Sequence, residues 1–184
     1  MKWKWMTSMI LLIMALSMTA AQAETAGVSD GASVADVLLK GAEAVLMPDG
    51  TQRTMDELLP DEEGAAWSRF TRVDLDADGE MDVVAEMVVG EYPVWYLLLK
   101  QQGDRTAMQL VPYRGLMHLK DDGSFEYSNS AMDGGAARYE WTDEGFVLVP
   151  ADEDQSAVHQ EALDALWYEY SQEWLERILL EQTG

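Results

Sequence analysis

Short apolar segments separated by turn residues run through the middle of the chain, and they limit the fold more than any other feature. The segments have the length and the Val, Leu and aromatic content of β-strands, and Gly-Asp and Asp-Gly pairs between them favour tight turns. The expected strands span residues 69–73, 82–89, 94–101, 106–112, 116–119, 124–127, 137–141 and 145–149. Because short turns can only join antiparallel neighbours, the sequence predicts an antiparallel β-meander. Segments 83–89 and 95–99 are apolar on both faces, which places them in the centre of a covered sheet.

The residues before these strands predict mixed local structure. Ser33 is a favourable N-cap for a short helix over 33–40, and Gly41 would end that helix. We expect a strand over 43–47 to follow, and then a capped helical turn that begins at Thr54.

The hydrophobic period changes near the C-terminus. Large apolar side chains recur at helical spacing at Leu163, Trp167, Tyr170, Trp174 and Ile178, which predicts one amphipathic helix from about 155 to 182. The aromatic members could form a partner surface or a sugar platform, but packing on the sheet is the simpler interpretation. The predicted class is therefore α+β, an antiparallel β-meander with a C-terminal amphipathic helix packed on the sheet.

The first 23 residues have the pattern of a secretory signal. Lys2 and Lys4 precede an apolar run over 9–18, and Ala21 and Ala23 form a small-residue cleavage site. The apolar run is too short for a membrane anchor. We expect cleavage after Ala23, a flexible lead-in over 24–32, and a single α+β domain over 33–184. The product would be secreted or extracytoplasmic, with no stable membrane insertion.

Charge and cysteine content exclude several classes of function. The 184 residues include 12 basic and 34 acidic side chains, for a net charge of −22, which disfavours nucleic acid and anionic surfaces as partners. The 48% hydrophobic content argues against a disordered acidic tail. Since the chain has no cysteine, it has no disulfide, thiolate metal site, cysteine nucleophile or bacterial lipid anchor.

An acidic loop between two expected strands carries the strongest local motif. Counted from Asp74, carboxylates occupy positions 1, 3, 5 and 9 and a glycine occupies position 6, which is the order of a calcium loop. Four neighbouring carboxylates repel one another, so the loop must either spread into solvent or hold a cation. The alternative to a metal site is a solvated acidic turn. The predicted Ca²⁺ ligands are the side chains of Asp74, Asp76, Asp78 and Asp82 and the backbone carbonyl of Glu80.

This loop differs from a helical EF-hand and resembles another calcium turn. Position 12 is Ala85 rather than a bidentate glutamate, and the flanking segments are strands. The loop resembles the strand–loop–strand DxDxDG turn of FG-GAP and VCBS-type extracellular repeats. That resemblance implies that Asp82 acts as the strong ligand. A single copy excludes a multi-blade propeller, and the missing ligand implies weak binding, with Kd about 10⁻⁴–10⁻³ M.

A second resemblance covers residues 70–141. The runs 113–117, 119–125 and 128–135 resemble a family of uncharacterised secreted or lipid-anchored proteins of Gram-positive bacteria, in which a DLDGDG-like loop precedes the same pattern. This chain departs from them in lacking the anchor cysteine and in having Ala77 within the loop. The resemblance implies no particular activity.

Residues 128–135 are polar and rich in glycine, so we expect an ordered loop there rather than a core strand. Its hydroxyl groups and Asp133 would cap backbone groups or contact Arg114. The functional alternative is a small polar pocket formed by Arg114, Ser128, Ser130 and Asp133.

Signatures of enzymes are weak in this sequence. It has no HExxH, GxSxG, P-loop or GxGxxG motif. His118 and His159 lie in no catalytic or metal-binding pattern, and His118 is expected to be a structural residue of a strand. Glu86 is expected to be buried and paired with Arg114 or Arg72.

The sequence thus favours a secreted, acidic, non-catalytic calcium-binding accessory or binding domain, with an extracellular protein or glycan as its partner. The alternative is an extracellular hydrolase of wall or host polymers that uses paired carboxylates. Whether the protein is an enzyme stays open, with a non-enzyme favoured.

Overall fold

The computed structural model describes residues 31–130 and 133–180. The predicted signal peptide over 1–23 and most of the lead-in over 24–32 lie outside the described residues. The described part contains strands and helices in one chain, which agrees with the predicted α+β class.

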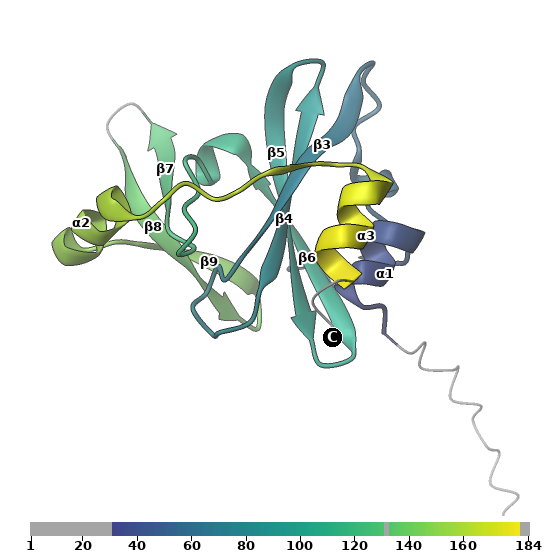
Figure 1. Cartoon of the computed structure of the whole chain (residues 1–184), viewed down its shortest axis with the longest axis horizontal. Coiled ribbons are helices and arrows are strands. Elements are labelled where there is room, and N and C mark those ends of the chain that lie inside the picture. The colour runs from purple at the N-terminus through teal and green to yellow at the C-terminus, as the bar shows by residue number, and fades with distance from the viewer. Residues whose placement is uncertain (1–30, 131–132, 181–184) are drawn as a thin grey trace, which may run out of the picture.

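A seven-stranded sheet forms the centre of the molecule (Figure 1). Its spatial order is β10-β3-β4-β5-β6-β1-β2, so β4 and β5 are interior strands, as their apolar sequences predicted. Strands β3 to β6 form an antiparallel meander, and β1 joins β6 in parallel. The strands are β1 (Ala44–Leu46), β2 (Thr51–Arg53), β3 (Ala65–Val73), β4 (Asp82–Val89), β5 (Tyr92–Gln102), β6 (Arg105–Pro112) and β10 (Tyr168–Glu169).

A second, three-stranded sheet contains β7 (Phe125–Ser130), β8 (Asp133–Thr142) and β9 (Gly145–Pro150) in that order. Two predictions here were wrong. Residues 116–119 make only a bridge between Met117 and Glu126. Residues 128–130 and 133–135 are strand ends rather than a loop, with Ser128 paired to Gly134. This end of the hairpin projects from the body of the molecule, so its polar and glycine residues need no apolar partners (Figure 1).

The two faces of the large sheet belong to two hydrophobic clusters. The first cluster lies between the sheets and joins Val84, Leu98 and other residues of the large sheet to Phe125, Tyr139 and Phe146 of the small one. The sheets are also tied by Gln109 on β6, whose side-chain amide exchanges two hydrogen bonds with the Phe146 backbone, of 2.7 and 2.9 Å. The second cluster lies on the opposite face and includes buried side chains of both α1 and α3.

The first helices begin and end where the sequence predicted. α1 (Val34–Lys40) starts after Ser33, whose hydroxyl accepts from the Asp36 N–H, and ends at Gly41 in the left-handed region. Two 3₁₀ turns follow, η1 (Asp56–Leu58) and η2 (Tyr113–Gly115), and just before the first the Thr54 hydroxyl accepts from the Glu57 N–H at 3.4 Å. Among the described residues, no helix has both the length and the apolar content needed to cross a bilayer.

The single C-terminal helix predicted over 155–182 was wrong. The chain instead forms α2 (Glu153–Glu161), the short strand β10 and α3 (Gln172–Leu180), and residues 181–184 lie outside the described residues. Between the helices, backbone N–H groups bond to Leu119 and Ser68 rather than to the preceding turn. These hydrogen bonds and the pairing of β10 with the edge of β3 replace those of a helix.

The predicted apolar stripe is consequently divided between different environments. Leu163 is 72% exposed, Trp167 packs against the first cluster, and Tyr170, Trp174 and Ile178 pack against the second. The aromatic rings that suggested a partner surface therefore contribute to the packed interior.

Candidate cation site

The acidic loop connects β3 to β4, as predicted, and it is anchored by an apolar side chain. Leu75 is fully buried in the first cluster, while residues 77–81 are exposed. The turn needs two residues in the left-handed region, Gly79 at φ 90° and Ala77 at φ 58°. For alanine this conformation costs about 1–2 kcal/mol, so the contacts around the loop must hold it in place.

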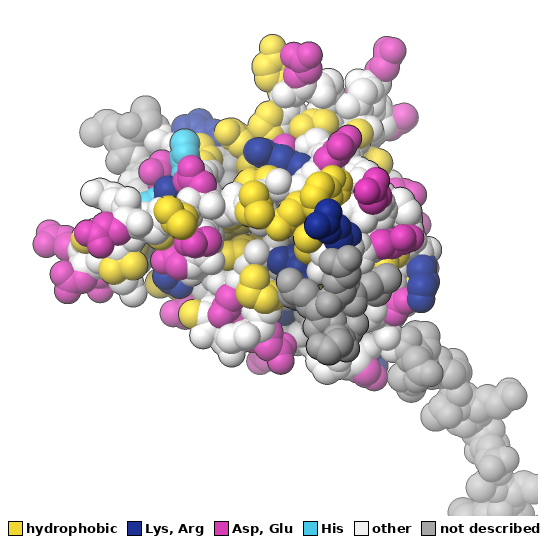
Figure 2. Space-filling view, in the orientation of Figure 1, with side chains coloured by type: hydrophobic (Ala, Val, Ile, Leu, Met, Phe, Trp, Pro, Cys, Tyr) yellow, Lys and Arg dark blue, Asp and Glu magenta, His cyan; other side chains and the backbone are white. Residues whose placement is uncertain are grey.

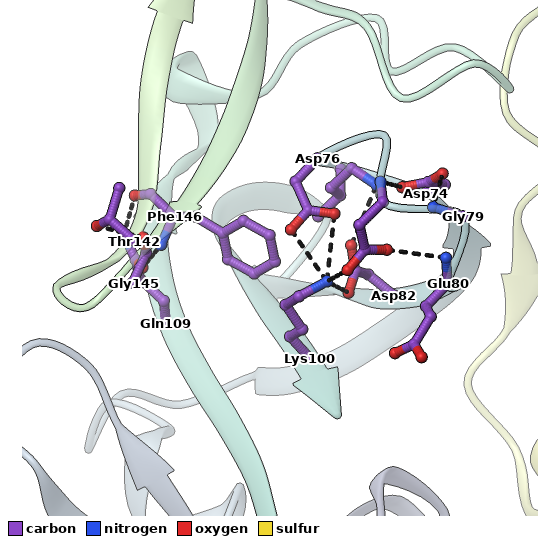
Figure 3. A network of polar contacts seen from close by, with 12 residues as sticks. Asp74, Asp76, Gly79, Glu80, Asp82, Lys100, Gln109, Thr142, Gly145 and Phe146 are labelled. Carbon is purple, nitrogen blue, oxygen red and sulfur yellow. Dashed lines mark hydrogen bonds and ion pairs between the residues drawn. The ribbon is translucent and has the colours of Figure 1, made fainter. Parts of the chain in front are cut away.

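Hydrogen bonds within the loop turn its aspartates inward (Figure 3). The Asp74 carboxylate accepts from the N–H groups of Asp78 at 3.1 Å and Gly79 at 2.9 Å. Asp78 accepts from the Glu80 N–H at 2.8 Å, and Asp82 accepts from the Leu75 N–H at 3.1 Å. The carboxylates thereby satisfy the backbone of a tight turn, which is the role that aspartate fills in such turns.

Lys100 of β5 places an ammonium group among these carboxylates (Figure 3). Its Nζ lies 3.0 Å from Asp76, 2.7 Å from Asp78 and 3.4 Å from Asp82. The Lys100 side chain is only 4% exposed, as is that of Asp76. Lys100 therefore provides a positive charge among the carboxylates for which the sequence analysis expected a cation.

The pKa values follow from burial and from this ammonium group. Burial raises the pKa of the Asp82 carboxyl to about 7, although the charge of Lys100 and the Leu75 N–H lower it in part. The hydrogen bond from Lys100, followed by that from the Glu80 N–H, holds the pKa of Asp78 below its ordinary value. Burial also disfavours the charged form of Lys100, but its bonds to Asp78 and Asp76 outweigh that effect and raise the pKa of Lys100.

The predicted calcium ligands are only partly brought together. Asp74, Asp76 and Asp78 can each offer one carboxylate oxygen such that these atoms lie within 4.8 Å of one another. Two oxygens bound to one Ca²⁺ at 2.3–2.6 Å are at most about 5 Å apart, so these three fit a single ion. Asp82 instead bonds to Lys100 and Leu75, and Glu80 gives its N–H to Asp78 while its side chain is exposed.

The charges of the site do not cancel. Four carboxylates and one ammonium group leave three negative charges, or two when Asp82 holds a proton. The inner residues Lys100, Asp76 and Asp82 are nearly inaccessible, whereas the Asp78 side chain is 40% exposed. The uncompensated charge therefore lies on the solvent side. There a shallow depression is lined by Asp76, Asp78, Lys100, Gln102, Glu140 and Trp141.

The polar set predicted around Arg114 is partly assembled. Arg114 donates to the Ser128 hydroxyl at 2.7 Å, and that hydroxyl lies 3.1 Å from the Ser130 carbonyl. Asp133 accepts from Asn129 at 3.3 Å. Arg114, Ser130 and Asp133 are exposed, so these contacts brace the surface of a hairpin.

Glu86 is buried as predicted, but the predicted partners Arg114 and Arg72 were wrong. Arg69, directly opposite on β3, donates two hydrogen bonds to it, of 2.9 and 2.7 Å. Ser68 and Tyr96 donate further bonds at 2.7 and 3.3 Å. The strand register that makes Arg69 the neighbour of Glu86 includes a bulge, which the sequence did not reveal.

Both histidines lie near one carboxylate, which the sequence analysis missed. His118 Nε2 lies 4.0 Å and His159 Nε2 3.8 Å from different oxygens of Glu126. His118 is not in a strand, and its φ is 50°. Because the three residues come from a loop, β7 and α2, no local motif joins them.

Comparison with models of protein families, with curated proteins and with solved structures found no match to this chain.

Proposed function

We propose that the chain is an exported, non-catalytic binding or accessory domain of the cell exterior whose acidic loop binds Ca²⁺ weakly. In this proposal Lys100 neutralises part of the negative charge of the loop, and Asp74, Asp76 and Asp78 bind the ion. The partner is an extracellular protein or glycan. The export signal and the resemblance to FG-GAP and VCBS-type turns support the same assignment.

One observation carries the proposal. Three carboxylate oxygens that lie within 4.8 Å of one another belong to a loop with two to three uncompensated negative charges. A hard divalent cation with oxygen ligands matches that charge and spacing. Lys100 and the missing position-12 ligand both weaken binding, so a Kd near the upper end of about 10⁻⁴–10⁻³ M is expected.

The hydrolase alternative would need a carboxylic acid that is free to exchange a proton. Glu86, the buried acid on the central strand, accepts hydrogen bonds from Ser68, Arg69 and Tyr96. These four hydrogen bonds make Glu86 a structural partner of the neighbouring side chains, which favours the binding domain over the hydrolase.

Thermal melting in 10 mM calcium and in EDTA tests the proposal. With Kd near 10⁻³ M, calcium adds about 1.4 kcal/mol to the free energy of unfolding and raises the Tm by about 3–6 °C. Asp74→Asn removes a ligand charge without touching Lys100, so this variant should lose most of the increase. Magnesium should have less effect, because it requires a smaller octahedral site.

Asp61→Asn is the matched control, since it makes the same charge change at an exposed site outside the loop. It should keep the full calcium-dependent increase. Equal wild-type midpoints in the two buffers would contradict the proposal. An equal loss of the calcium-dependent increase in Tm in Asp74→Asn and Asp61→Asn would also contradict it, because calcium would then act through general charge screening.

A further inference from the structure

A cleft of about 290 Å³ lies between the two sheets. The large sheet contributes residues of β1 and of the hairpin between β5 and β6, and the small sheet contributes the end of β8 and the turn to β9. Polar and apolar side chains both line it, among them Met47, Gln102, Arg105, Trp141, Thr142 and Asp143. Ligand pockets have volumes of about 300–1,000 Å³, so a cleft at the lower end of that range holds one small chemical unit.

Contacts between and within the sheets fix the turn that forms one wall of the cleft. The Gln109 side chain holds the Phe146 backbone through two hydrogen bonds, and Gly145 packs so closely on Gln109 that a β-carbon there would overlap with it. Within the turn, the Thr142 hydroxyl donates to the Gly145 carbonyl at 3.0 Å and accepts from the Glu144 N–H at 3.1 Å (Figure 3). A wall that is held in this way loses little conformational entropy when a ligand binds.

Trp141 is the large aromatic side chain of the cleft, and it is half-buried. Its ring packs edge-to-face with that of Phe146, at a centroid distance of 4.9 Å and an angle of 80°, and it also contacts the first cluster. These contacts fix the orientation of the indole, while the rest of the side chain lines the cleft. An indole held in this way offers a ligand a flat apolar surface and one N–H donor.

Polar side chains that the fold does not use lie around Trp141. Within the described residues, the side chains of Gln102 and Asp143 make no hydrogen bond or ion pair. The Arg105 guanidinium lies 4.0 Å from the exposed carboxylate of Asp104, and Gln102, Arg105 and Asp143 are all exposed. They supply an amide that donates and accepts, a guanidinium that donates and a carboxylate that accepts. The cleft therefore combines an aromatic surface with hydrogen-bonding groups of both kinds.

From this combination we propose that the cleft binds one sugar unit of a neutral glycan. A pyranose ring has an apolar face of C–H groups, which suits the indole of Trp141. Its hydroxyl groups both donate and accept, so they suit Gln102, Arg105 and Asp143. The inference deepens the proposed function by naming the class of partner, and it rests on the binding role proposed there but not on calcium.

Other classes of partner match the cleft less well. Specific protein interfaces bury about 1,200–2,000 Å² and have an apolar centre, whereas this cleft holds one small unit between polar side chains. Polyanions are disfavoured by the net charge of −22. A basic peptide is the main competitor, because Glu140 and Asp143 provide acidic groups next to an aromatic ring.

Electrophoresis of the purified protein through native gels that contain a neutral polysaccharide tests the proposal. The probes are a β-glucan, a xylan, a galactomannan and glycol chitin, each in the presence of EDTA. At least one should retard the wild type. Trp141→Ala should raise the dissociation constant for that probe by more than about tenfold, since aromatic anchors dominate binding. Gln102→Ala and Asp143→Asn should each raise it by about two- to tenfold, the effect of one hydrogen bond.

The chain offers two matched controls outside the cleft. Trp95→Ala removes an indole that is 41% exposed elsewhere on β5, and Glu144→Gln changes the acid next to Asp143. Both should be retarded as the wild type is. Trp141 is half-buried, so the variants at the exposed side chains of Gln102 and Asp143 keep the test decisive if Trp141→Ala does not fold.

Retardation of the wild type by none of the four polysaccharides would overturn the proposal. So would unchanged retardation in the cleft variants, or an equal loss in Trp95→Ala. Binding of oligolysine alone, lost in Asp143→Asn, would assign the cleft to a basic peptide instead. Because EDTA keeps calcium from the acidic loop, failure of calcium binding and failure of glycan binding are distinguishable.

Discussion

Lys100 and Asp82 lie on neighbouring central strands and point to the same side of the sheet. Lys100 follows Leu99, whose partner on β4 is Val83, the residue after Asp82. Both side chains are almost inaccessible, at 4% and 2% exposed. Their charges are therefore screened little by solvent, and each strongly affects the protonation of the other.

The first prediction concerns Asp82. Its pKa is about 7 in the folded protein and 3.8 in the ordinary case, so between these pH values the folded state binds more protons than the unfolded state. Its contribution to stability is fully present below pH 3.8 and is lost as pH rises through 7. In EDTA, the free energy of unfolding of the wild type should fall relative to Asp82→Asn between pH 5 and 8, by about 2–3 kcal/mol.

Denaturant unfolding at several pH values measures this difference. Asp61→Asn, at an exposed site, should show no such pH-dependent gap from the wild type. A constant difference between the wild type and Asp82→Asn from pH 5 to 8 would mean that Asp82 stays ionised throughout.

Part of the cation site could be predicted from the sequence because it is local. The spacing of Asp74, Asp76 and Asp78 and the position of Gly79 describe a turn within one short segment. Lys100 comes from another strand, so its position depends on the register between β4 and β5. One signal was available, since Lys100 is a charged residue that directly follows the apolar run 95–99 of a central strand.

At the level of elements, the antiparallel meander was predictable and the C-terminal region was not. Hairpin strands and their turns are adjacent in the sequence, and α1 has a local N-cap and a glycine stop. The segment over 155–182 has helical periodicity throughout, but β10 pairs with β3, nearly 100 residues earlier in the chain. Tertiary hydrogen bonds of that kind override local helical propensity.

The second prediction concerns two leucines of the segment over 155–182. Leu175 is 2% exposed in the second cluster, so Leu175→Ala should lower the free energy of unfolding by about 2–5 kcal/mol. Leu163 is 72% exposed between α2 and β10, so Leu163→Ala should change it by less than about 0.5 kcal/mol. Urea denaturation of both variants provides the comparison. Equal, large losses would indicate one continuous helix with both residues buried.

Considered as a whole, the molecule places two groups of unlike chemistry on different elements. The acidic loop lies beside the large sheet and offers oxygen ligands, whereas His118 and His159 lie near Glu126 of the small sheet. Both are open to solvent on one side, and acidic side chains are spread over the visible surface (Figure 2). Such a surface favours cations as ligands and disfavours polyanions as partners.

The central claim is that the loop needs cationic charge, of which Lys100 supplies one part and calcium another. Calorimetric titration of the wild type and of Lys100→Met with calcium at pH 7.5 tests it most directly. Loss of the ammonium group removes a like charge close to the ion, so Lys100→Met should bind calcium at least about tenfold more tightly than the wild type. Equal affinities, or no binding of 10 mM calcium by either protein, would contradict the claim.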